Sequence, residues 1–258
     1  MSSLRALGRG VVTASRFRTT TIASLYPNPS SRRFHYNPHR KLLKHSSPLS
    51  MEAAAAARVS TSTVSNGEGG DGFIRFPLSP SSSLAIQKGD ITQWFVDAKT
   101  DAIVNPANER MLGGGGADGA IHRAAGPDLL QACHNVPEVR PGVRCPTGEA
   151  RITPGFKLPA SHVIHTVGPI YNAVNDPQAL LRSSYRNSLS VAKENNIQYV
   201  AFPAISCGVF GYPFDEAATI AISTVKEFSN DFKEVHFVLF SPDSYNAWLN
   251  MANEVLKD

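Results

Sequence analysis

The sequence predicts an α/β fold in which short buried strands form a parallel sheet and helices pack against it. Two observations lead to this prediction. From residue 73 onward, short apolar segments alternate with stretches of helical character. Two glycine-rich segments also follow predicted strands and precede predicted helices, which is where ligands bind in sheets of this kind.

The predicted elements follow one another along residues 73–258, a length sufficient for one sizeable core. Strands are expected at 73–78, 84–88, 102–105, 149–153, 162–167, 199–203 and 235–240. Helices are expected at 118–125, 127–133, 177–195, 214–229 and 243–256. One helix start is marked by Pro213 ahead of Asp215 and Glu216, because a fixed φ and negative charge both favour a helix N-terminus.

Residues 1–51 have the composition of an organelle-targeting leader. They contain nine of the 25 Lys and Arg residues, none of the 21 Asp and Glu residues, and many Ser and Thr residues. This composition is typical of a mitochondrial or chloroplast transit peptide, with a disordered basic tail as the alternative. Residues 52–72 are expected to be a flexible linker. Met51, followed by Glu52 and five alanines, suggests a second start site and an untargeted cytosolic or nuclear form.

The charge and the cysteines exclude several classes of function. Residues 52–258 hold 16 basic and 21 acidic residues, so their formal charge is −5 and the basic pI belongs to the leader. We therefore expect no direct binding of nucleic acid, and no apolar run is long enough to span a membrane. Neither a disulfide framework nor a metal site is indicated by the spacing of Cys133, Cys145, Cys207, His134, His162, His165 and His236.

Residues 105–122 join a strand end, four consecutive glycines, and a helix start that carries an acid and an imidazole. The glycines, residues 113–116, let backbone N–H groups approach a ligand closely, which suits a diphosphate. Asp118 and His122 are four residues apart, so on a helix beginning near Asp118 both side chains project from one face over this loop. Together they have the chemistry to orient and deprotonate a water molecule.

Each of these residues also has a purely structural interpretation. The four glycines are compatible with a flexible surface loop, and Asp118 with a helix N-cap. His122 is compatible with a core histidine. Asn108 is compatible with a turn residue whose side chain binds its own backbone.

A second glycine-rich turn, residues 206–211, also lies between a predicted strand and a predicted helix. In a parallel sheet, two such loops at the carboxyl ends of strands face one crevice. Phe210 is interpreted as packing against a sugar, with filling of the core as the alternative. Asp90, just after the strand at 84–88, is a candidate to accept a hydrogen bond from an exocyclic amine, with a turn residue or helix N-cap as the alternative.

The order and spacing of these segments resemble the macrodomain family, specifically its MacroD-like branch, over nearly all of residues 84–257. The segments that carry the resemblance are Gly-Asp-Ile-Thr from 89, Asp-Ala-Ile-Val-Asn from 101, the stretch 112–127, Pro-Thr-Gly-Glu-Ala from 146, His-Val-Ile-His-Thr-Val-Gly-Pro from 162 and Ala-Phe-Pro-Ala-Ile-Ser from 201. The resemblance implies a three-layer α/β/α sandwich with a mixed central sheet, which binds ADP-ribose in a cleft at its crest.

The resemblance also implies roles for individual residues. Asp90 would hold the adenine amine, with Ile91 beside it, and Asn105 and Asn108 would belong to the ligand site, Asn108 at the distal ribose. Asp118 would position or activate water, and His122 would orient that arrangement, with Asn108 as the third member of the catalytic set. The diphosphate and distal ribose would lie between two loops formed by Gly113, Gly114, Gly115, Gly116, Ser206, Cys207, Gly208, Val209 and Phe210.

The chain departs from the family pattern at three positions. Pro106 stands where the family commonly has Ala, and proline removes a backbone donor. Cys207 and Phe210 stand where Thr and Tyr are common, so one hydroxyl contact is lost and an aromatic face is kept. Cys207 is interpreted as a small buried substitute for Thr, with a redox-sensitive thiol of lowered pKa as the alternative.

By this resemblance the protein is expected to be a hydrolase that removes ADP-ribose from modified Asp or Glu side chains, or deacetylates O-acetyl-ADP-ribose. Its partners would be ADP-ribose, ADP-ribosylated proteins or O-acetyl-ADP-ribose, without a cofactor or metal, and the protein is expected to be monomeric. One alternative is a non-catalytic reader of ADP-ribose. The other is a phosphatase that acts on ADP-ribose 1″-phosphate.

Overall fold

The computed structural model describes residues 72–256, so the predicted targeting leader and nearly all of the predicted linker lie outside the described residues. Seven strands form one sheet in the order β1-β2-β7-β6-β3-β5-β4. The five inner strands run parallel, whereas the two edge strands β1 and β4 are antiparallel to their neighbours. The strands are β1 (Phe73–Ser79), β2 (Ser82–Lys88), β3 (Asp101–Pro106), β4 (Ala150–Pro154), β5 (His162–Thr166), β6 (Tyr199–Phe202) and β7 (Glu234–Leu239).

Five α-helices connect or follow these strands. All seven predicted strands and all five predicted helices are confirmed, with boundaries that differ by a few residues. Two short 3-10 helices, η1 and η2, were not predicted. The helices are α1 (Gly116–Ala125), α2 (Pro127–Asn135), α3 (Pro177–Glu194), α4 (Phe214–Lys226), α5 (Pro242–Val255), η1 (Ile91–Gln93) and η2 (Tyr171–Ala173).

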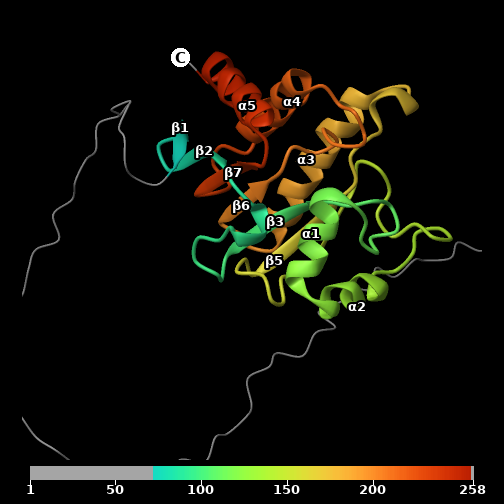
Figure 1. The fold of residues 1–258 in the computed structure, drawn as a ribbon. Helices are drawn as coiled ribbons and strands as arrows, with labels where there is room; N and C mark the ends of the chain where they lie inside the picture. Colours follow the sequence, from blue (N-terminus) through green and yellow to red (C-terminus); the bar gives the residue numbers. More distant parts are fainter. Residues whose placement is uncertain (1–71, 257–258) are drawn as a thin grey trace, which may run out of the picture. The chain divides into compact units, whose positions relative to one another are not determined.

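The sheet lies between two layers of helices, as Figure 1 shows. Alternate residues of a strand point to opposite faces, and β3 illustrates the result. Ala102 and Val104 pack in the core shared with α3, α4 and α5, whereas Ile103 packs in the core shared with α1 and α2. Because both faces are covered, β3 is apolar without alternation. The predicted three-layer α/β/α sandwich with a mixed sheet is therefore confirmed.

Aromatic side chains hold the inner strands against the larger helical layer. The rings of Tyr185 on α3 and Phe202 on β6 lie 5.3 Å apart, and Phe202 lies 5.9 Å from Phe237 on β7. Phe237 in turn lies 5.8 Å from Trp248 on α5, and all four side chains are fully buried. These contacts fix the carboxyl ends of β6 and β7 relative to each other. Among the described helices, none is both long and apolar enough to cross a membrane.

Candidate functional site

A cleft of about 640 Å³ opens at the carboxyl ends of the five parallel strands. Its position follows from topology, because loops that leave the same ends of parallel strands meet at one edge of the sheet. Both glycine-rich loops contribute, which agrees with the prediction that they face one crevice. Loops and strand ends supply one part of the lining: residues 89–91 after β2, 106–107 at the end of β3, 168 after β5, 203–204 and 206–210 after β6, and 238 and 240 at the end of β7. The helices and their N-terminal residues supply the rest: 115–118 and 120 at α1, 214 at α4, and 241 and 244 at α5.

Asp90 lies in the cleft and is also the N-cap of η1. Its Oδ1 accepts hydrogen bonds from the Thr92 backbone N–H at 2.9 Å and from the Thr92 hydroxyl at 2.8 Å. The N-cap interpretation of Asp90 is therefore confirmed. Both capping bonds go to Oδ1, so the cap is compatible with a ligand contact through Oδ2. Ile91, which follows, is buried beside it in the cleft wall.

The four-glycine loop packs closely against the start of α1. Gly113 and Gly116 have φ angles of +79° and +57°, which side chains with a Cβ rarely adopt. A Cβ on Gly114 would lie 2.9 Å from Asp118 Oδ2, and one on Gly119 would overlap the Gly114 carbonyl oxygen. These approaches rule out the interpretation of the glycines as a loose surface loop. The helix begins at Gly116 with Gly115 as its N-cap, so Asp118 is not a capping residue.

Asp118 is buried in the cleft wall at 4% exposure. Its Oδ1 accepts a hydrogen bond of 2.8 Å from Asn105 Nδ2 and lies 3.5 Å from His122 Nε2, whereas Oδ2 has no partner among the described residues. Burial raises the pKa of Asp118, while the Asn105 bond and the His122 charge oppose that rise. The predicted pairing of Asp118 and His122 on one helix face is thus confirmed. It yields a carboxylate that is more basic than usual and has one free oxygen.

Several predicted residues support the cleft from behind and do not line it. Asn108 Oδ1 accepts from the Arg110 backbone N–H at 3.1 Å, which confirms the turn interpretation, and its Nδ2 donates to the Gly113 carbonyl at 3.0 Å. Asn108 therefore holds the glycine loop in place. The other predicted residues that do not line the cleft are Asn105, Gly113, Gly114 and His122.

The loop after β6 forms the opposite wall of the cleft. Ser206 has a φ of +65°, and its buried hydroxyl has no partner among the described residues. Cys207 is partly buried, and its thiol donates to the Ile205 carbonyl at 3.4 Å. Burial raises the pKa of Cys207 to about 12, so the redox-sensitive alternative, which requires a lowered pKa, is wrong. Val209 is 99% exposed, and Phe210 is half-buried in the cleft wall.

The sequence did not lead us to the aromatic residue at the end of β7. Phe240 lines the cleft and is 85% exposed. The Gly89 backbone N–H donates to the Leu239 carbonyl at 3.0 Å, which holds the end of β2 and Asp90 beside this residue. The available signal was its position, because Phe240 is the last residue of the strand predicted at 235–240, and the other cleft loops also begin at the ends of predicted strands.

His165, one of the histidines whose spacing indicates no metal site, contacts Asn105 beside the candidate site. It is fully buried on β5 and pairs in register with Asn105 on β3, so the two side chains lie next to each other. Its Nδ1 lies 3.1 Å from Asn105 Nδ2, and its Nε2 lies 3.0 Å from the Thr153 hydroxyl. Burial, with a smaller effect of the His122 charge, lowers the pKa of His165 to about 3, so this imidazole is neutral.

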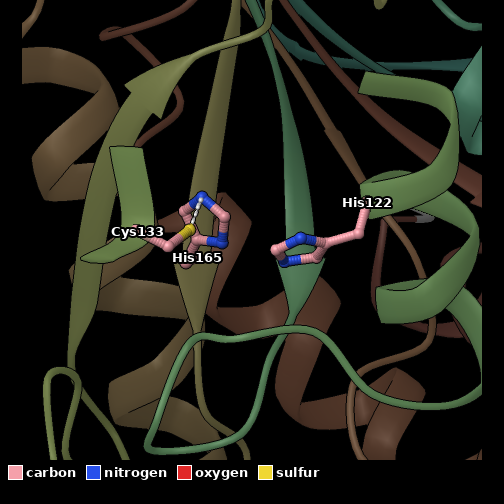
Figure 2. A group of neighbouring side chains, drawn as sticks. All are labelled: His122, Cys133 and His165. Carbon is pink, nitrogen blue, oxygen red and sulfur yellow. Dashed lines mark hydrogen bonds between the residues drawn. The ribbon is translucent and has the colours of Figure 1, made fainter. Parts of the chain in front are cut away.

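Figure 2 shows His122, Cys133 and His165 as a group, with the Cys133 sulfur beside the His165 ring. One potential ligand atom from each residue lies within 4.8 Å of the others, which is close enough for the three to share a metal ion. A metal on His165 Nε2 would leave the proton on Nδ1, facing the NH₂ group of Asn105. A metal on Nδ1 would displace Asn105. The hydrogen bonds of His165 therefore fit this group poorly as a metal site.

Comparison with known proteins gives matches over most of the described residues. The family model "Macro domain" matches residues 104–221. A macro domain-containing protein of Xanthomonas campestris is 49% identical over 170 residues, which cover 64% of this chain and 92% of that protein. A solved Oceanobacillus iheyensis macrodomain with ADP has 43% identity and a TM-score of 0.66, covering 71% and 96% of the two chains. A Trypanosoma brucei macrodomain in complex with ADP-ribose has 38% identity and a TM-score of 0.58, covering 68% and 73%.

Proposed function

The chain belongs to the Macro domain family, and from that premise and the geometry of its cleft we propose that it is an ADP-ribosyl-ester hydrolase of the MacroD-like branch. Its substrates would be ADP-ribose esters of Asp or Glu side chains, and O-acetyl-ADP-ribose. The two solved relatives described above are macrodomains with ADP and with ADP-ribose, and this chain shares their fold, which supports the proposal. A volume of about 640 Å³ is within the usual range for small-ligand sites.

In this proposal the ligand spans the carboxyl ends of the strands. The adenine lies near Asp90 and Phe240, where a carboxylate oxygen and an exposed aromatic face are available. The diphosphate lies between the two glycine-rich loops, whose backbone N–H groups suit an anion. The distal ribose lies by Phe210 and the loop that Asn108 holds. This places the ester bond near Asp118.

The reaction adds water across the bond that joins the distal ribose to the acyl group. Asp118 Oδ2 accepts a hydrogen bond from the water and draws off its proton as the new C–O bond forms. The proton held by Asp118 then passes to the leaving ribose oxygen, or to solvent when a carboxylate leaves, so Asp118 is ionised again and the products are ADP-ribose and the acid. Asn105 donates to Oδ1, whereas the buried Oδ2 has no partner among the described residues and is the oxygen that we assign to water.

The observation that carries this proposal is the state of Asp118. It is a buried carboxylate in the cleft wall with a raised pKa, and one of its oxygens has no partner in the part of the chain that the structure describes. Raised carboxyl pKa values are typical of general bases, and a protein that only reads ADP-ribose has no need for such a group.

The test is release of ADP-ribose from a protein mono-ADP-ribosylated on glutamate, measured with the full-length chain. We expect multiple turnovers. Absence of release, together with calorimetrically measured binding of ADP-ribose, would identify a reader. Release of phosphate from ADP-ribose 1″-phosphate, without ester cleavage, would identify the phosphatase alternative.

A further inference from the structure

Four side chains form a continuous line of hydrogen bonds that runs from the edge strand β4, across β5 and β3, to Asp118 in the cleft wall. Thr153 on β4 bonds to His165 on β5 at 3.0 Å, and His165 bonds to Asn105 on β3 at 3.1 Å. Asn105 then donates to Asp118 on α1 at 2.8 Å. Each of the four is at most 4% exposed. Bulk water therefore does not compete for these hydrogen bonds, and each is electrostatically stronger than it would be in water.

The donors and acceptors in this line are fixed by chemistry. The NH₂ group of Asn105 has two hydrogens, and its two neighbours are Asp118 Oδ1 and His165 Nδ1. His165 Nδ1 must therefore be the unprotonated nitrogen of the ring. In a neutral imidazole the proton then sits on Nε2, where the Thr153 hydroxyl oxygen accepts it.

The opposite arrangement changes the environment of Asp118. If His165 carried its proton on Nδ1, the Asn105 amide would have to turn and present its oxygen to that proton. The same amide oxygen would then face Asp118 Oδ1. Two acceptor oxygens with no hydrogen between them repel each other, and this repulsion disfavours the ionised form of Asp118. The tautomer of His165 therefore decides whether Asp118 receives a donor and stays ionised.

We propose that His165 is a positioning residue for hydrolysis, which orients the Asn105 amide through its unprotonated Nδ1 and so holds Asp118 ionised with Oδ2 free for water. This inference rests on the proposed function and adds a residue to it that does not touch the substrate. Cys133 is a neutral neighbour of this line, because burial raises the pKa of its thiol to about 12. The titratable groups around Asp118 are His122 on α1, Cys133 on α2 and His165 on β5.

The test compares two replacements of His165 in the full-length protein. His165→Leu removes the acceptor for Asn105, whereas His165→Gln retains an acceptor oxygen and a donor nitrogen. We expect His165→Leu to lower kcat on the order of tenfold to a hundredfold, the usual cost of losing an orienting partner, with little change in KM. His165→Gln should recover most of that loss. His162→Leu, a histidine on the same strand without contact to Asn105, is the matched control and should retain the wild-type rate.

The pH profile separates positioning from simple destabilisation. Asp118 acts when ionised, so kcat falls as pH falls through its pKa. The Asn105 bond lowers that pKa, and its loss in His165→Leu should move the acid limb to higher pH. The proposal would be overturned if His165→Leu left both kcat and the acid limb of the pH profile unchanged. It would also be overturned if His165→Leu and His165→Gln lowered kcat equally.

A second measurement does not depend on activity or on the folding of a variant. Nitrogen-15 NMR of the wild-type histidine rings should find Nδ1 of His165 unprotonated and Nε2 protonated. Protonation at Nδ1 would overturn the proposal even if the enzyme is active. If the wild type releases no ADP-ribose, the hydrolase function fails, but the positioning of Asp118 is still decided by a separate titration of its carboxyl group. The pKa of Asp118 should match in wild type and His165→Gln and be higher in His165→Leu, and an equal pKa in all three proteins would overturn the positioning role.

Discussion

Asp118→Asn is the substitution that most directly tests the proposed chemistry. The introduced amide oxygen can still accept from Asn105, since only one atom of the carboxylate is exchanged for NH₂. The group that replaces Oδ2 cannot accept a proton. Loss of a general base typically costs about 10²- to 10⁴-fold in rate, or roughly 3–5 kcal/mol of activation free energy. We expect kcat to fall by that amount while ADP-ribose binding is retained.

The same substitution is expected to stabilise the folded protein at neutral pH. Because the pKa of Asp118 is raised in the folded state, its contribution to stability is present below the unfolded pKa and is lost as pH rises through the folded pKa. Asparagine does not ionise, so the variant does not lose stability in this way as pH rises. Relief of a destabilised active-site group usually gives about 0.5–2 kcal/mol. The stability difference between variant and wild type, measured by urea unfolding, should therefore grow between acidic and neutral pH.

The assay combines single-turnover ADP-ribose release, calorimetric binding of ADP-ribose, and unfolding at several pH values. Asp128→Asn is the matched control, because Asp128 is also an acid in the first turn of a helix but does not line the cleft. It should leave both rate and pH dependence unchanged. A wild-type rate in Asp118→Asn would refute its role as base, and an unchanged pH dependence of stability would refute the raised pKa.

Four further outcomes are expected. Gly119→Ala should slow turnover and weaken ADP-ribose binding, by calorimetry, because the added Cβ overlaps the Gly114 carbonyl and overpacking typically costs about 1–3 kcal/mol. Phe240→Ala should weaken ADP-ribose binding by about 1–3 kcal/mol without lowering single-turnover rate at saturation, as expected for loss of an aromatic face under a base. Cys207, with its pKa raised to about 12, should react with iodoacetamide at mildly alkaline pH far more slowly than free cysteine, by mass spectrometry. A fluorescent reporter fused to residues 1–60 should enter mitochondria or plastids, and a cytosolic signal would contradict the targeting prediction.

The fold could be predicted because local sequence and global arrangement agree. The apolar segment at β3 is short and continuous, which indicates a strand covered on both faces. Pro213 and the acids after it mark the start of α4. The 3-10 helix η1 was missed because its signal is a single capping residue, Asp90, which is equally compatible with a turn. A single 3-10 turn such as η1 is too short to leave a periodic pattern in the sequence.

The site was only partly predictable, because its supporting residues depend on strand order. Asp118 and His122 are near in sequence, and helical geometry alone brings them together. His165 and Asn105 are 60 residues apart and meet only because β3 and β5 are neighbours in register. The order of the strands is not sequential, and a lone histidine on an apolar strand gives no sign of its partner. Phe240 was missed for the same reason, since its place beside Asp90 depends on the pairing of β2 with β7.

The arrangement around Asp118 also explains why so much of this cleft is glycine and backbone. A buried carboxylate is costly, and here one donor and one nearby imidazole stabilise Oδ1, while Oδ2 has no partner within residues 72–256. A Cβ at Gly114 would lie 2.9 Å from Asp118 Oδ2, closer than a side chain normally approaches. In the proposed hydrolase, Asp118 therefore requires a glycine next to Oδ2 and a hydrogen-bond donor at Oδ1. Both requirements are met by neighbouring strands and by a helix that begins within the glycine loop.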